Sequence, residues 1–287
     1  MTDATAPIAL VTGTSTGIGL STAVSLAAAG WTTIATMRDL SKADALEAAA
    51  AQAGVALDIR ALDVTDHDAV ASTIEALVAE HGRLDAVINN AGAGALGTIE
   101  AMSLDRVRAA MEVNFFGVVD VTKTALPHLR ASRGRLITVT SVGGVVGQPF
   151  NEAYCAAKFA VEGFMESLHP VMKSLGVAVS VIEPGPVLTE FVANSDADRE
   201  ALLTGADAAY LPAVDSYLAR TRQAFAPGNA QTPDDVAAVI LATLTADDPA
   251  FRVQTSAGAT AFTAIKLKDL DGSAVTGLTT GWVSAQG

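Results

Sequence analysis

Cysteine and histidine are scarce in this sequence. The single cysteine, Cys155, can form no disulfide within the chain and leaves too few thiolates for a cysteine-based metal site. The four histidines (His67, His81, His128 and His169) are scattered, and none falls in a zinc-binding spacing such as HExxH. The sequence therefore predicts no resident metal ion.

Positive charge is scarce as well. The chain has 18 Lys and Arg residues against 31 Asp and Glu residues, a formal net charge of −13, and no basic run. Such a surface repels phosphate backbones and anionic lipids. We therefore expect no nucleic-acid partner and no binding to a membrane surface.

Long uninterrupted apolar runs are also missing. The stretch from Ala4 to Met37 carries no charge, but glycines break it and Thr and Ser are frequent in it. It also lacks the basic start of a signal peptide. We interpret it as strand, turn, helix and strand in a protein without a membrane span, and we expect a cytoplasmic location.

What the sequence does contain is a regular alternation of two patterns along 287 residues, half of them apolar. Apolar runs that predict buried strands lie at 8–13, 32–37, 57–64, 84–92, 135–142, 177–185 and 251–257. Helical patterns lie between them at 66–81, 100–131, 152–175 and 233–244. This alternation predicts an α/β fold, a parallel sheet covered by helices on both faces, in one domain over 1–287.

Residues 186–230 depart from this alternation. They form a long mixed segment with acidic patches and several large apolar side chains. A segment of this length in a compact domain is often a lid or a substrate-binding region. We expect that role here, and a surface helix pair without a function is the alternative.

The first predicted turn is rich in glycine. The sequence TGTSTGIG places three glycines between an apolar strand and a helix, in the spacing GxxxGxG instead of the general GxGxxG. Such a turn lets the backbone approach a pyrophosphate closely and aims the helix N–H groups at it. The predicted dinucleotide contacts of this turn are Gly13, Ser15, Thr16, Gly17, Ile18 and Gly19.

The end of the second predicted strand indicates which dinucleotide is bound. Met37 is followed by Arg38 and then by Asp39. A carboxylate here usually takes the ribose 2′-hydroxyl of NAD, whereas an arginine takes the 2′-phosphate of NADP through a bidentate fork. Arg38, together with the hydroxyl of Ser15, favours NADP(H). Asp39 keeps NAD(H) as the alternative.

The third and fourth predicted strands end in polar residues. Asp63 and Val64 end the third strand, and the run Asn89–Asn90–Ala91–Gly92 ends the fourth. Ligands of open α/β sheets sit at the carboxyl ends of strands. We therefore predict that Asp63, Val64, Asn90, Ala91 and Gly92 line the cofactor groove, although each alone suits a turn or a helix cap.

A tyrosine and a lysine stand four positions apart in the segment YCAAK. On a helix this spacing puts Tyr154 and Lys158 on one face, about 5–6 Å apart at Cβ. Alone, they would be interpreted as a surface pair. However, Ser141 ends the fifth predicted strand, and Asn114 lies inside a helical pattern where asparagine gains little. Lowering the pKa of a phenol from about 10 to about 7 requires roughly 4 kcal/mol, which an ammonium and an oxidised nicotinamide could supply together.

These motifs together resemble those of the short-chain dehydrogenase/reductase family, in its single-domain branch. TGTSTGIG, NNAG, Asn114, Ser141, YCAAK and PGPVLT (184–189) occur in the family's order and spacing over residues 8–190. Within the family, ATMRDL (35–40), EPGPVLTEF (183–191), FRVQTSAGA and KDLDGS are similar to the retinol dehydrogenase and 17β-hydroxysteroid dehydrogenase group.

The resemblance implies a Rossmann-type doubly wound parallel sheet in three α/β/α layers. It also implies hydride transfer between a nicotinamide and an alcohol/carbonyl pair, with Tyr154 as general acid and base. Ser141 would hydrogen-bond the reacting oxygen. Lys158 would lower the pKa of the tyrosine and hold the nicotinamide ribose, and Asn114 would support a water-mediated proton relay.

The same resemblance implies further contacts and partners. Pro184, Gly185, Val187 and Thr189 would contact the nicotinamide carboxamide, while Tyr154 and Lys158 also touch the cofactor. The expected substrate is hydrophobic and similar to a steroid, a retinoid or a lipid. The expected assembly is a homodimer or homotetramer.

Three other functions stay open at this point. The first is an NAD-dependent alcohol dehydrogenase of small or polar substrates. The second is a non-catalytic dinucleotide sensor, which would have no need of the proton-transfer residues. The third is an isomerase or dehydratase that uses its cofactor transiently, although such enzymes usually resemble longer, two-domain relatives.

Overall fold

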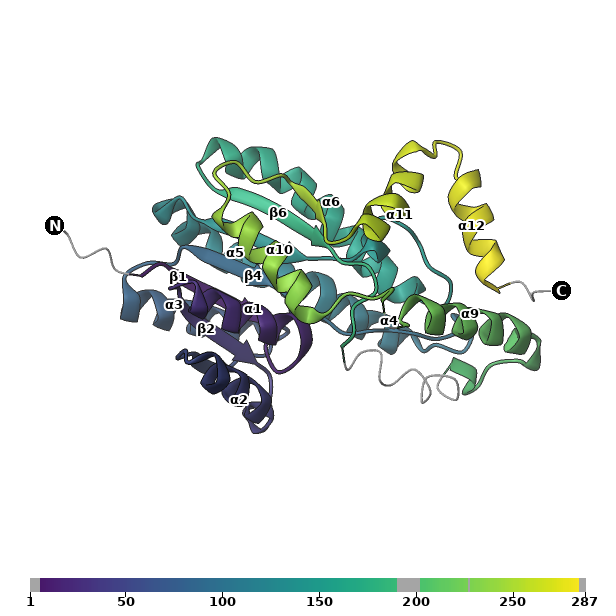
Figure 1. Ribbon diagram of the computed structural model, residues 1–287, viewed down its shortest axis with the longest axis horizontal. Helices are drawn as coiled ribbons and strands as arrows, with labels where there is room; N and C mark the ends of the chain where they lie inside the picture. Colours follow the sequence, from purple (N-terminus) through teal and green to yellow (C-terminus); the bar gives the residue numbers. More distant parts are fainter. Residues whose placement is uncertain (1–5, 190–201, 227, 284–287) are drawn as a thin grey trace.

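The computed structural model describes residues 6–189, 202–226 and 228–283 (Figure 1). Seven parallel strands form one sheet in the order β3-β2-β1-β4-β5-β6-β7. The strands are β1 (Ile8–Thr12), β2 (Thr32–Met37), β3 (Asp58–Ala61), β4 (Ala86–Asn89), β5 (Arg135–Val139), β6 (Ala178–Glu183) and β7 (Arg252–Gln254). All seven predicted strands are present, and the predicted Rossmann-type parallel sheet is confirmed.

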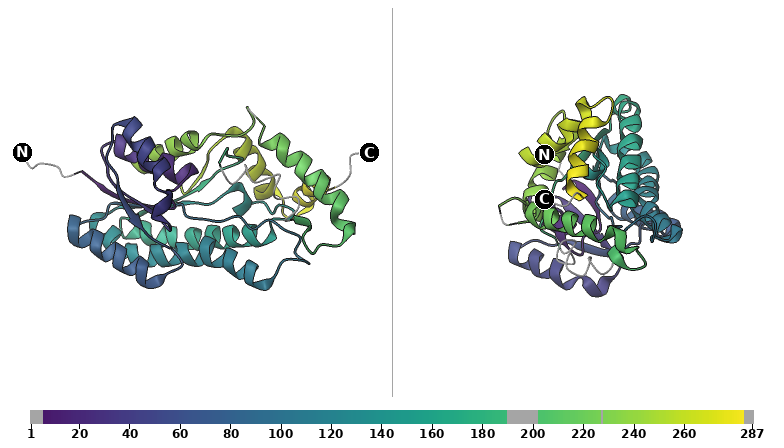
Figure 2. Two further views of the ribbon diagram at one scale, coloured as in Figure 1. Left: turned by 90° about the horizontal axis from the view of Figure 1, so that it is seen from below. Right: turned by 90° about the vertical axis from the view of Figure 1, so that its right-hand side faces the viewer.

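The strands are apolar on both faces because helices cover both faces. Every residue of β1 and of β4 is buried. One face carries α1 (Gly17–Ala28), α2 (Asp44–Ala53) and α10 (Pro233–Thr245), and the other carries α3 (His67–His81), α5 (Gly117–Ser132) and α6 (Glu152–Ser174). The left view of Figure 2 shows the sheet between these two helical layers. The predicted three-layer architecture is therefore confirmed.

The helix predicted at 100–131 is interrupted. The structure has α4 (Leu104–Met111), a π-helical turn at Glu112–Phe116 and then α5. A π turn shifts the backbone bonds by one residue and is frequently found at functional sites. Its side-chain pattern stays close to that of an α-helix, so the apolar periodicity gave no sign of it.

Helix α10 begins where the sequence predicted a first helical turn. Pro233 is its first residue, and Thr232 and Asp235 form a capping box in which Oγ1 of Thr232 accepts from N of Asp235 at 3.2 Å. Such a cap satisfies two backbone N–H groups that otherwise lack partners. The cap fixes the start of a helix that packs along α1.

Three helices gather beyond the carboxyl ends of the strands. They are α9 (Leu211–Ala224), α11 (Ala257–Lys268) and α12 (Ser273–Val283), visible on the right of Figure 1. Tyr217 and Leu218 of α9 pack with Trp282 of α12 in an apolar cluster of their own. These helices therefore build an apolar wall at the edge of the sheet where ligands of this architecture bind.

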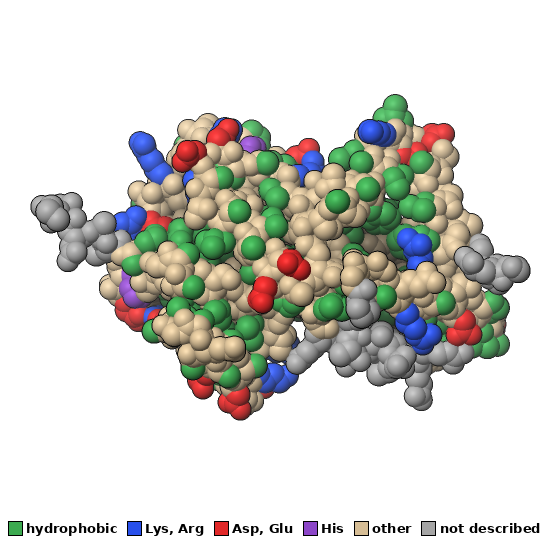
Figure 3. All heavy atoms as spheres, in the orientation of Figure 1, with side chains coloured by type: hydrophobic (Ala, Val, Ile, Leu, Met, Phe, Trp, Pro, Cys, Tyr) green, Lys and Arg blue, Asp and Glu red, His purple; other side chains and the backbone are tan. Residues whose placement is uncertain are grey.

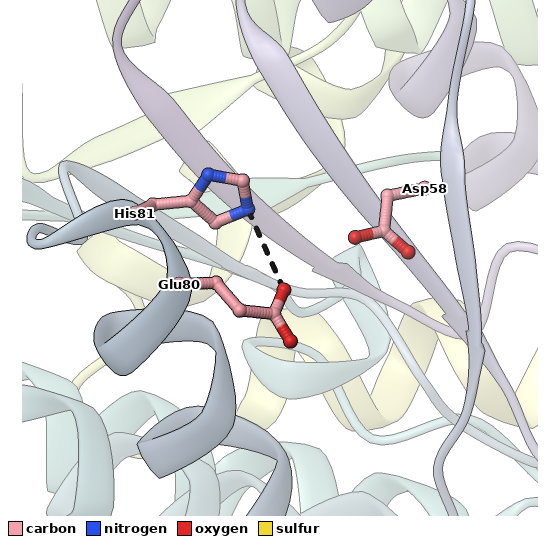
Figure 4. A group of neighbouring side chains, drawn as sticks. All are labelled: Asp58, Glu80 and His81. Atoms are coloured by element: carbon pink, nitrogen blue, oxygen red, sulfur yellow. Dashed lines mark ion pairs between the residues drawn. The ribbon is translucent and has the colours of Figure 1, made fainter.

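An ion-pair cluster lies at the edge of the sheet that is formed by β3. Asp58, Glu80 and His81 lie within reach of one another, and Nε2 of His81 is 4.0 Å from Glu80 (Figure 4). The guanidinium of Arg60 already pairs with both carboxylates. The Arg60 guanidinium thus occupies the place between these carboxylates. The charged side chains on this edge strand disfavour its pairing with a strand of another chain.

The surface agrees with the acidic composition. On the face drawn in Figure 3, basic side chains of the described residues are scattered and do not form a continuous patch. None of the helices in the described part of the chain is both long and apolar enough to cross a bilayer.

Candidate active site

The glycine-rich turn is packed tightly between β1 and β4. Gly13 and Gly17 have φ angles of 70° and 58°, in the left-handed region that favours glycine. A β-carbon built at Gly13 would lie 2.7 Å from Cα of Ala91, and one at Gly19 would lie 2.2 Å from the carbonyl oxygen of Gly13. Glycine is therefore required here for close approach of backbone to backbone.

Asn90 holds this turn against the end of β4. Its Nδ2 donates to the carbonyl oxygens of Thr12 and Gly13, at 2.9 Å each. Oγ1 of Thr12 in turn accepts from the backbone N of Asn90 and of Ala91, at 3.0 Å each. The predicted contacts of the first and fourth strands thus form one hydrogen-bonded unit, and Thr12 is a member that the sequence analysis missed.

The start of α1 is open toward this crevice. Its N-cap, Thr16, makes no side-chain hydrogen bond to the helix, and the first turn contains no acidic residue. Unpartnered N–H groups at a helix N-terminus attract phosphate oxygens. Ser15 and Ile18 lie beside Thr16 and Gly17, half-buried at the same helix start.

Arg38 stands between two carboxylates that are already engaged. The Asp39 carboxylate accepts from N and Oγ of Ser41 at 3.0 and 2.7 Å, and these hydrogen bonds hold the pKa of Asp39 below its usual value. Asp63 accepts from N and Oγ1 of Thr65 at 2.9 and 2.7 Å. Burial alone would raise the pKa of Asp63, but these bonds and the charge of Arg38 lower it. Arg38 itself makes no ion pair with any other described residue.

Ser141 and Tyr154 meet across a glycine. Oγ of Ser141 accepts from N of Gly143 at 2.9 Å. A β-carbon built at Gly143 would lie 3.3 Å from both Oγ of Ser141 and Cε1 of Tyr154. The strand end and the helix α6 therefore bring the hydroxyl of Ser141 and the phenol of Tyr154 to one point.

Lys158 lies one helical turn further along α6. Its Nζ is 5.8 Å from the ring centroid of Tyr154 and donates to the carbonyl oxygen of Val139, at the end of β5, at 3.0 Å. Burial lowers the pKa of Lys158 to about 8, against the opposing charge of Glu162. The pair is a feature of the interior, because Lys158 is 4% exposed, so the surface-pair alternative is excluded.

Burial governs the pKa of Tyr154 in the protein alone. Desolvation of the phenolate raises this pKa to about 12, and the hydrogen bond with Ser141 only partly offsets the effect. From the sequence, Lys158 and an oxidised nicotinamide are expected to lower this pKa together, and that joint effect stays a prediction.

Asn114 sits in the π turn and is fully buried. Its Nδ2 donates to the carbonyl oxygens of Ala93 and Ala110, at 2.8 and 2.9 Å, and its Oδ1 accepts from N of Ala93 at 3.2 Å. A β-carbon built at Gly92 would lie 2.9 Å from Oδ1 of Asn114 and 3.6 Å from Nζ of Lys158. Three sequence motifs far apart in the chain thus converge at Gly92.

The run after β6 closes the crevice from the other side. The carbonyl oxygen of Pro184 accepts from N of Val142 at 2.9 Å, just after Ser141. A β-carbon built at Gly17 would lie 3.0 Å from Cγ2 of Thr189, which places Thr189 against the start of α1. Val187 is buried and bridges to Gln231.

Not all the predicted residues play the same part in this crevice. Gly185 lies close to α11, where a β-carbon would be 3.6 Å from Cβ of Ala259. Val64 packs against Gly117 of α5. A β-carbon built at Gly117 would lie 2.8 Å from Cγ2 of Val64. These two positions are therefore constrained by helix packing as well as by the crevice.

The corner that leads into α6 carries a strained residue. Phe150 has a φ of 62°, uncommon for any residue with a side chain, and its carbonyl oxygen accepts from N of Gly97 at 2.9 Å. The next residue, Asn151, donates from Nδ2 to Oη of Tyr217 in α9 at 2.7 Å. Helix α9, within the segment 186–230, is thus tied to the helix that carries Tyr154. Residues 190–201 of that segment lie outside the described residues.

Comparison with known proteins identifies the family. The family model described as "short chain dehydrogenase" matches residues 7–200. The chain belongs to this family. Retinol dehydrogenase 8 of Bos taurus is 37% identical over 278 residues, covering 92% of this chain and 86% of the relative. The human 17-beta-hydroxysteroid dehydrogenase type 1 is 39% identical over 273 residues, covering 93% and 82%.

Solved structures agree with this assignment. A short-chain dehydrogenase from Streptomyces avermitilis superimposes with a TM-score of 0.77 at 28% identity, covering 96% of both chains. A variant of actinorhodin polyketide ketoreductase, crystallised with NADPH, gives a TM-score of 0.74 at 26% identity, covering 88% of this chain and 97% of that one. The fold, the family and the general class of oxidoreductase are therefore established.

Proposed function

We propose that this short-chain dehydrogenase is an NADP(H)-dependent oxidoreductase that interconverts an alcohol and a carbonyl on a hydrophobic substrate. The observation that carries the proposal is the convergence of Ser141, Tyr154 and Lys158 at the carboxyl ends of β5 and the start of α6. When bound, the nicotinamide supplies or accepts the hydride.

In this proposal the protein's own groups bind, orient and move a proton. Oη of Tyr154 gives a proton to the carbonyl oxygen during reduction and takes it from the hydroxyl during oxidation. Oγ of Ser141 donates a hydrogen bond to the same oxygen and stabilises its developing charge. Asn114, with its amide fixed by Ala93 and Ala110, keeps the π turn and Gly92 in place beside Lys158.

The choice of NADP(H) is supported by the engagement of Asp39. The Asp39 carboxylate already accepts two hydrogen bonds from Ser41 and caps a short helical turn. It is therefore less available to bind a ribose hydroxyl. Arg38, which has no ion-pair partner within the described ranges, is the group able to take a 2′-phosphate. NAD(H) is the second candidate, because Asp39 adjoins the same position.

Arg38→Ala tests the cofactor preference. Charge-assisted hydrogen bonds contribute about 1.5–3 kcal/mol, so we expect the Kd of NADPH to rise about 10- to 150-fold while that of NADH stays constant. Arg130→Ala, which removes an exposed guanidinium on α5, serves as the control. Equal losses for both dinucleotides would contradict the assignment of the phosphate to Arg38.

The hydrophobic substrate class is supported by two observations. The relatives bear names that refer to retinol and to 17β-hydroxysteroids. The helices α9, α11 and α12 present an apolar cluster that includes Phe150, Tyr217 and Trp282 beyond the strand ends. We propose that 186–230 acts as the lid of this substrate region, with Asn151 and Tyr217 as its attachment to α6.

The decisive assay follows the absorbance of reduced nicotinamide with a panel of apolar ketones and aldehydes. Turnover that disappears in Tyr154→Phe supports the oxidoreductase. Binding of NADPH without turnover across the panel would favour the dinucleotide sensor instead. Substrate conversion without net change in absorbance would indicate an isomerase.

We also propose a homodimer or homotetramer built on the helical layer of α4, α5 and α6. Phe116 and Phe159 are 50% and 38% exposed on these helices, and Leu104 is 68% exposed. Exposed apolar side chains that form a contiguous patch are typical of self-association surfaces, and we propose that these three residues contribute to one. Light scattering coupled to gel filtration measures the mass, and Phe116→Glu is expected to lower it to that of a monomer.

A further inference from the structure

Behind Lys158, helix α6 carries a buried carboxylate. Lys158 and Glu162 are each 4% exposed, and their spacing of four puts them on the helix face that also holds Tyr154. A β-carbon built at Gly144 would lie 3.0 Å from Cγ of Glu162 and 3.2 Å from the carbonyl oxygen of Lys158. The stem of Glu162 is therefore enclosed between α6 and the turn that follows Ser141.

A second buried carboxylate shares an arginine with the first. Nε of Arg252, on β7, is 3.2 Å from Oε2 of Glu162 and 3.3 Å from Oε1 of Glu183 at the end of β6. Nε2 of Gln254 donates to Oε2 of Glu183 at 2.8 Å. The far side of the guanidinium reaches the exposed Glu166 at 2.7 Å. The cluster thus joins α6, β6 and β7 behind Lys158.

The charges of this cluster do not balance without Lys158. Glu162 and Glu183 are two buried carboxylates, and Arg252 is one guanidinium whose charge is shared with Glu166 at the surface. An uncompensated charge inside a protein is costly. Among the described residues Lys158 is the buried lysine, and it lies one turn from Glu162. Lys158 completes the balance as two negative and two positive groups.

We propose that Glu162 is a positioning residue for the proton transfer: held by Arg252, its carboxylate is the counter-charge that keeps Lys158 an ammonium beside Tyr154. The effect on turnover rests on the proposed function. The electrostatic coupling of Glu162 to Lys158 does not, because it acts in the protein without any substrate.

The titration behaviour agrees with this arrangement. Burial raises the pKa of Glu162 to about 7, with the charge of Glu183 adding to the rise and Arg252 opposing it. Burial lowers the pKa of Lys158 to about 8, and Glu162 opposes that fall. Both groups are charged together in the window between these values. Protonation of Glu162 below this window, or loss of the Lys158 proton above it, removes the attraction between the two charges.

Glu162→Gln removes the charge and keeps the shape of the side chain. We expect the acid dissociation constant of Lys158 to rise at least about tenfold, because the remaining effect on the ammonium is desolvation. The alkaline limb of kcat/KM is then expected to move to lower pH by the same factor. Turnover well below that limb changes by less than about twofold.

The direct measurement is a 13C NMR titration of the full chain labelled at lysine Cε, with and without saturating NADP+. Lys158→Arg identifies the signal by its loss. The matched control is Glu166→Gln, which removes an equal charge from the same arginine at the surface. A tenfold shift in Glu162→Gln with none in Glu166→Gln supports the proposal. An unshifted Lys158, or equal shifts in both variants, overturns it.

A second variant keeps the test open if Glu162→Gln does not fold. Glu183→Gln also removes one buried negative charge from the cluster, but it leaves Glu162 in place and lowers its pKa, because the charge of Glu183 raises that pKa. The proposal therefore predicts that the acid dissociation constant of Lys158 does not rise in this variant. A tenfold rise in a folded Glu183→Gln protein overturns the proposal. Because the NMR readout needs no substrate, absence of turnover in every carbonyl assay would count against the proposed function alone.

Discussion

Replacing Gly19 by alanine is expected to damage both the stability and the cofactor site. The new β-carbon would lie 2.2 Å from the carbonyl oxygen of Gly13 and 2.4 Å from Nδ2 of Asn90. Neither neighbour can give way easily. The carbonyl belongs to the backbone of the turn, and Nδ2 of Asn90 makes hydrogen bonds of 2.9 Å to Thr12 and to Gly13.

The magnitude follows from these contacts. Forcing a methyl group into a packed site costs about 1–3 kcal/mol, and each lost hydrogen bond costs about 1 kcal/mol. The sum is roughly 3–5 kcal/mol, a large fraction of the roughly 5–15 kcal/mol that stabilises a folded domain. Displacement of the Gly13 peptide would also move the N–H groups proposed to bind the pyrophosphate, so the affinity for the proposed cofactor NADPH is expected to fall as well.

Gly163→Ala is the matched control. Gly163 lies within α6, no atom is within 4 Å of a β-carbon built there, and its φ is not in the left-handed region. We expect this variant to gain about 0.5–1 kcal/mol, because alanine is the better helix former. Urea unfolding and NADPH titration measure both effects. A Gly19→Ala protein within about 1 kcal/mol of the parent, with unchanged affinity, would refute the reasoning.

Three further predictions concern buried polar groups. Burial raises the pKa of Glu162 from 4.5 to about 7, so its contribution to stability is present below pH 4.5 and lost as the pH rises through 7, by about 3 kcal/mol. The loss in unfolding free energy between pH 5 and 8 is therefore expected to shrink in Glu162→Gln, and an equal loss in both proteins would contradict it. Asn114→Ala removes three hydrogen bonds to the backbone. We expect it to lower the unfolding free energy by about 2–4 kcal/mol and to lower kcat more than tenfold. A stable, fully active variant would contradict this prediction. Asn151→Ala and Tyr217→Phe each break the 2.7 Å hydrogen bond between Asn151 and α9, so each is expected to raise KM. If this bond causes both effects, the double variant has the same KM as the single variants, and a clearly higher KM in the double variant would contradict it.

The sheet and its motifs were predictable because they rest on local pattern. Apolar runs of four to eight residues between helical patterns define a parallel sheet, and in such a sheet all carboxyl ends meet at one edge. That geometry alone brings the glycine turn, Ser141 and YCAAK together. The positions of these residues in space then required no information beyond strand order.

Other features depend on contacts that a linear pattern does not contain. The π turn at Glu112–Phe116 has the apolar spacing of a helix, and it is stabilised by a side-chain amide bonding Ala93 across the crevice. The raised pKa of Tyr154 is a property of the enclosed volume around the ring. The end of α5 is also not evident from the sequence. Glycine is the usual residue in the left-handed conformation at a helix end, but here Arg133 adopts it, with φ of 53°, and Gly134 follows.

The central position of β1 has a consequence for synthesis on the ribosome. Strand β1 is synthesised before the other strands of this sheet. It is flanked by β2 on one side and by β4 on the other, and N of Ile8 donates to Oδ2 of Asp85 at 2.8 Å. Until β4 (Ala86–Asn89) has been translated, one edge of a strand that is wholly buried in the folded protein has no native partner. An unpaired edge of this kind is the place where nascent chains aggregate. Expression at high rates is therefore expected to benefit from chaperones that shield the segment between β1 and β4, and slow translation before β4 prolongs the exposure.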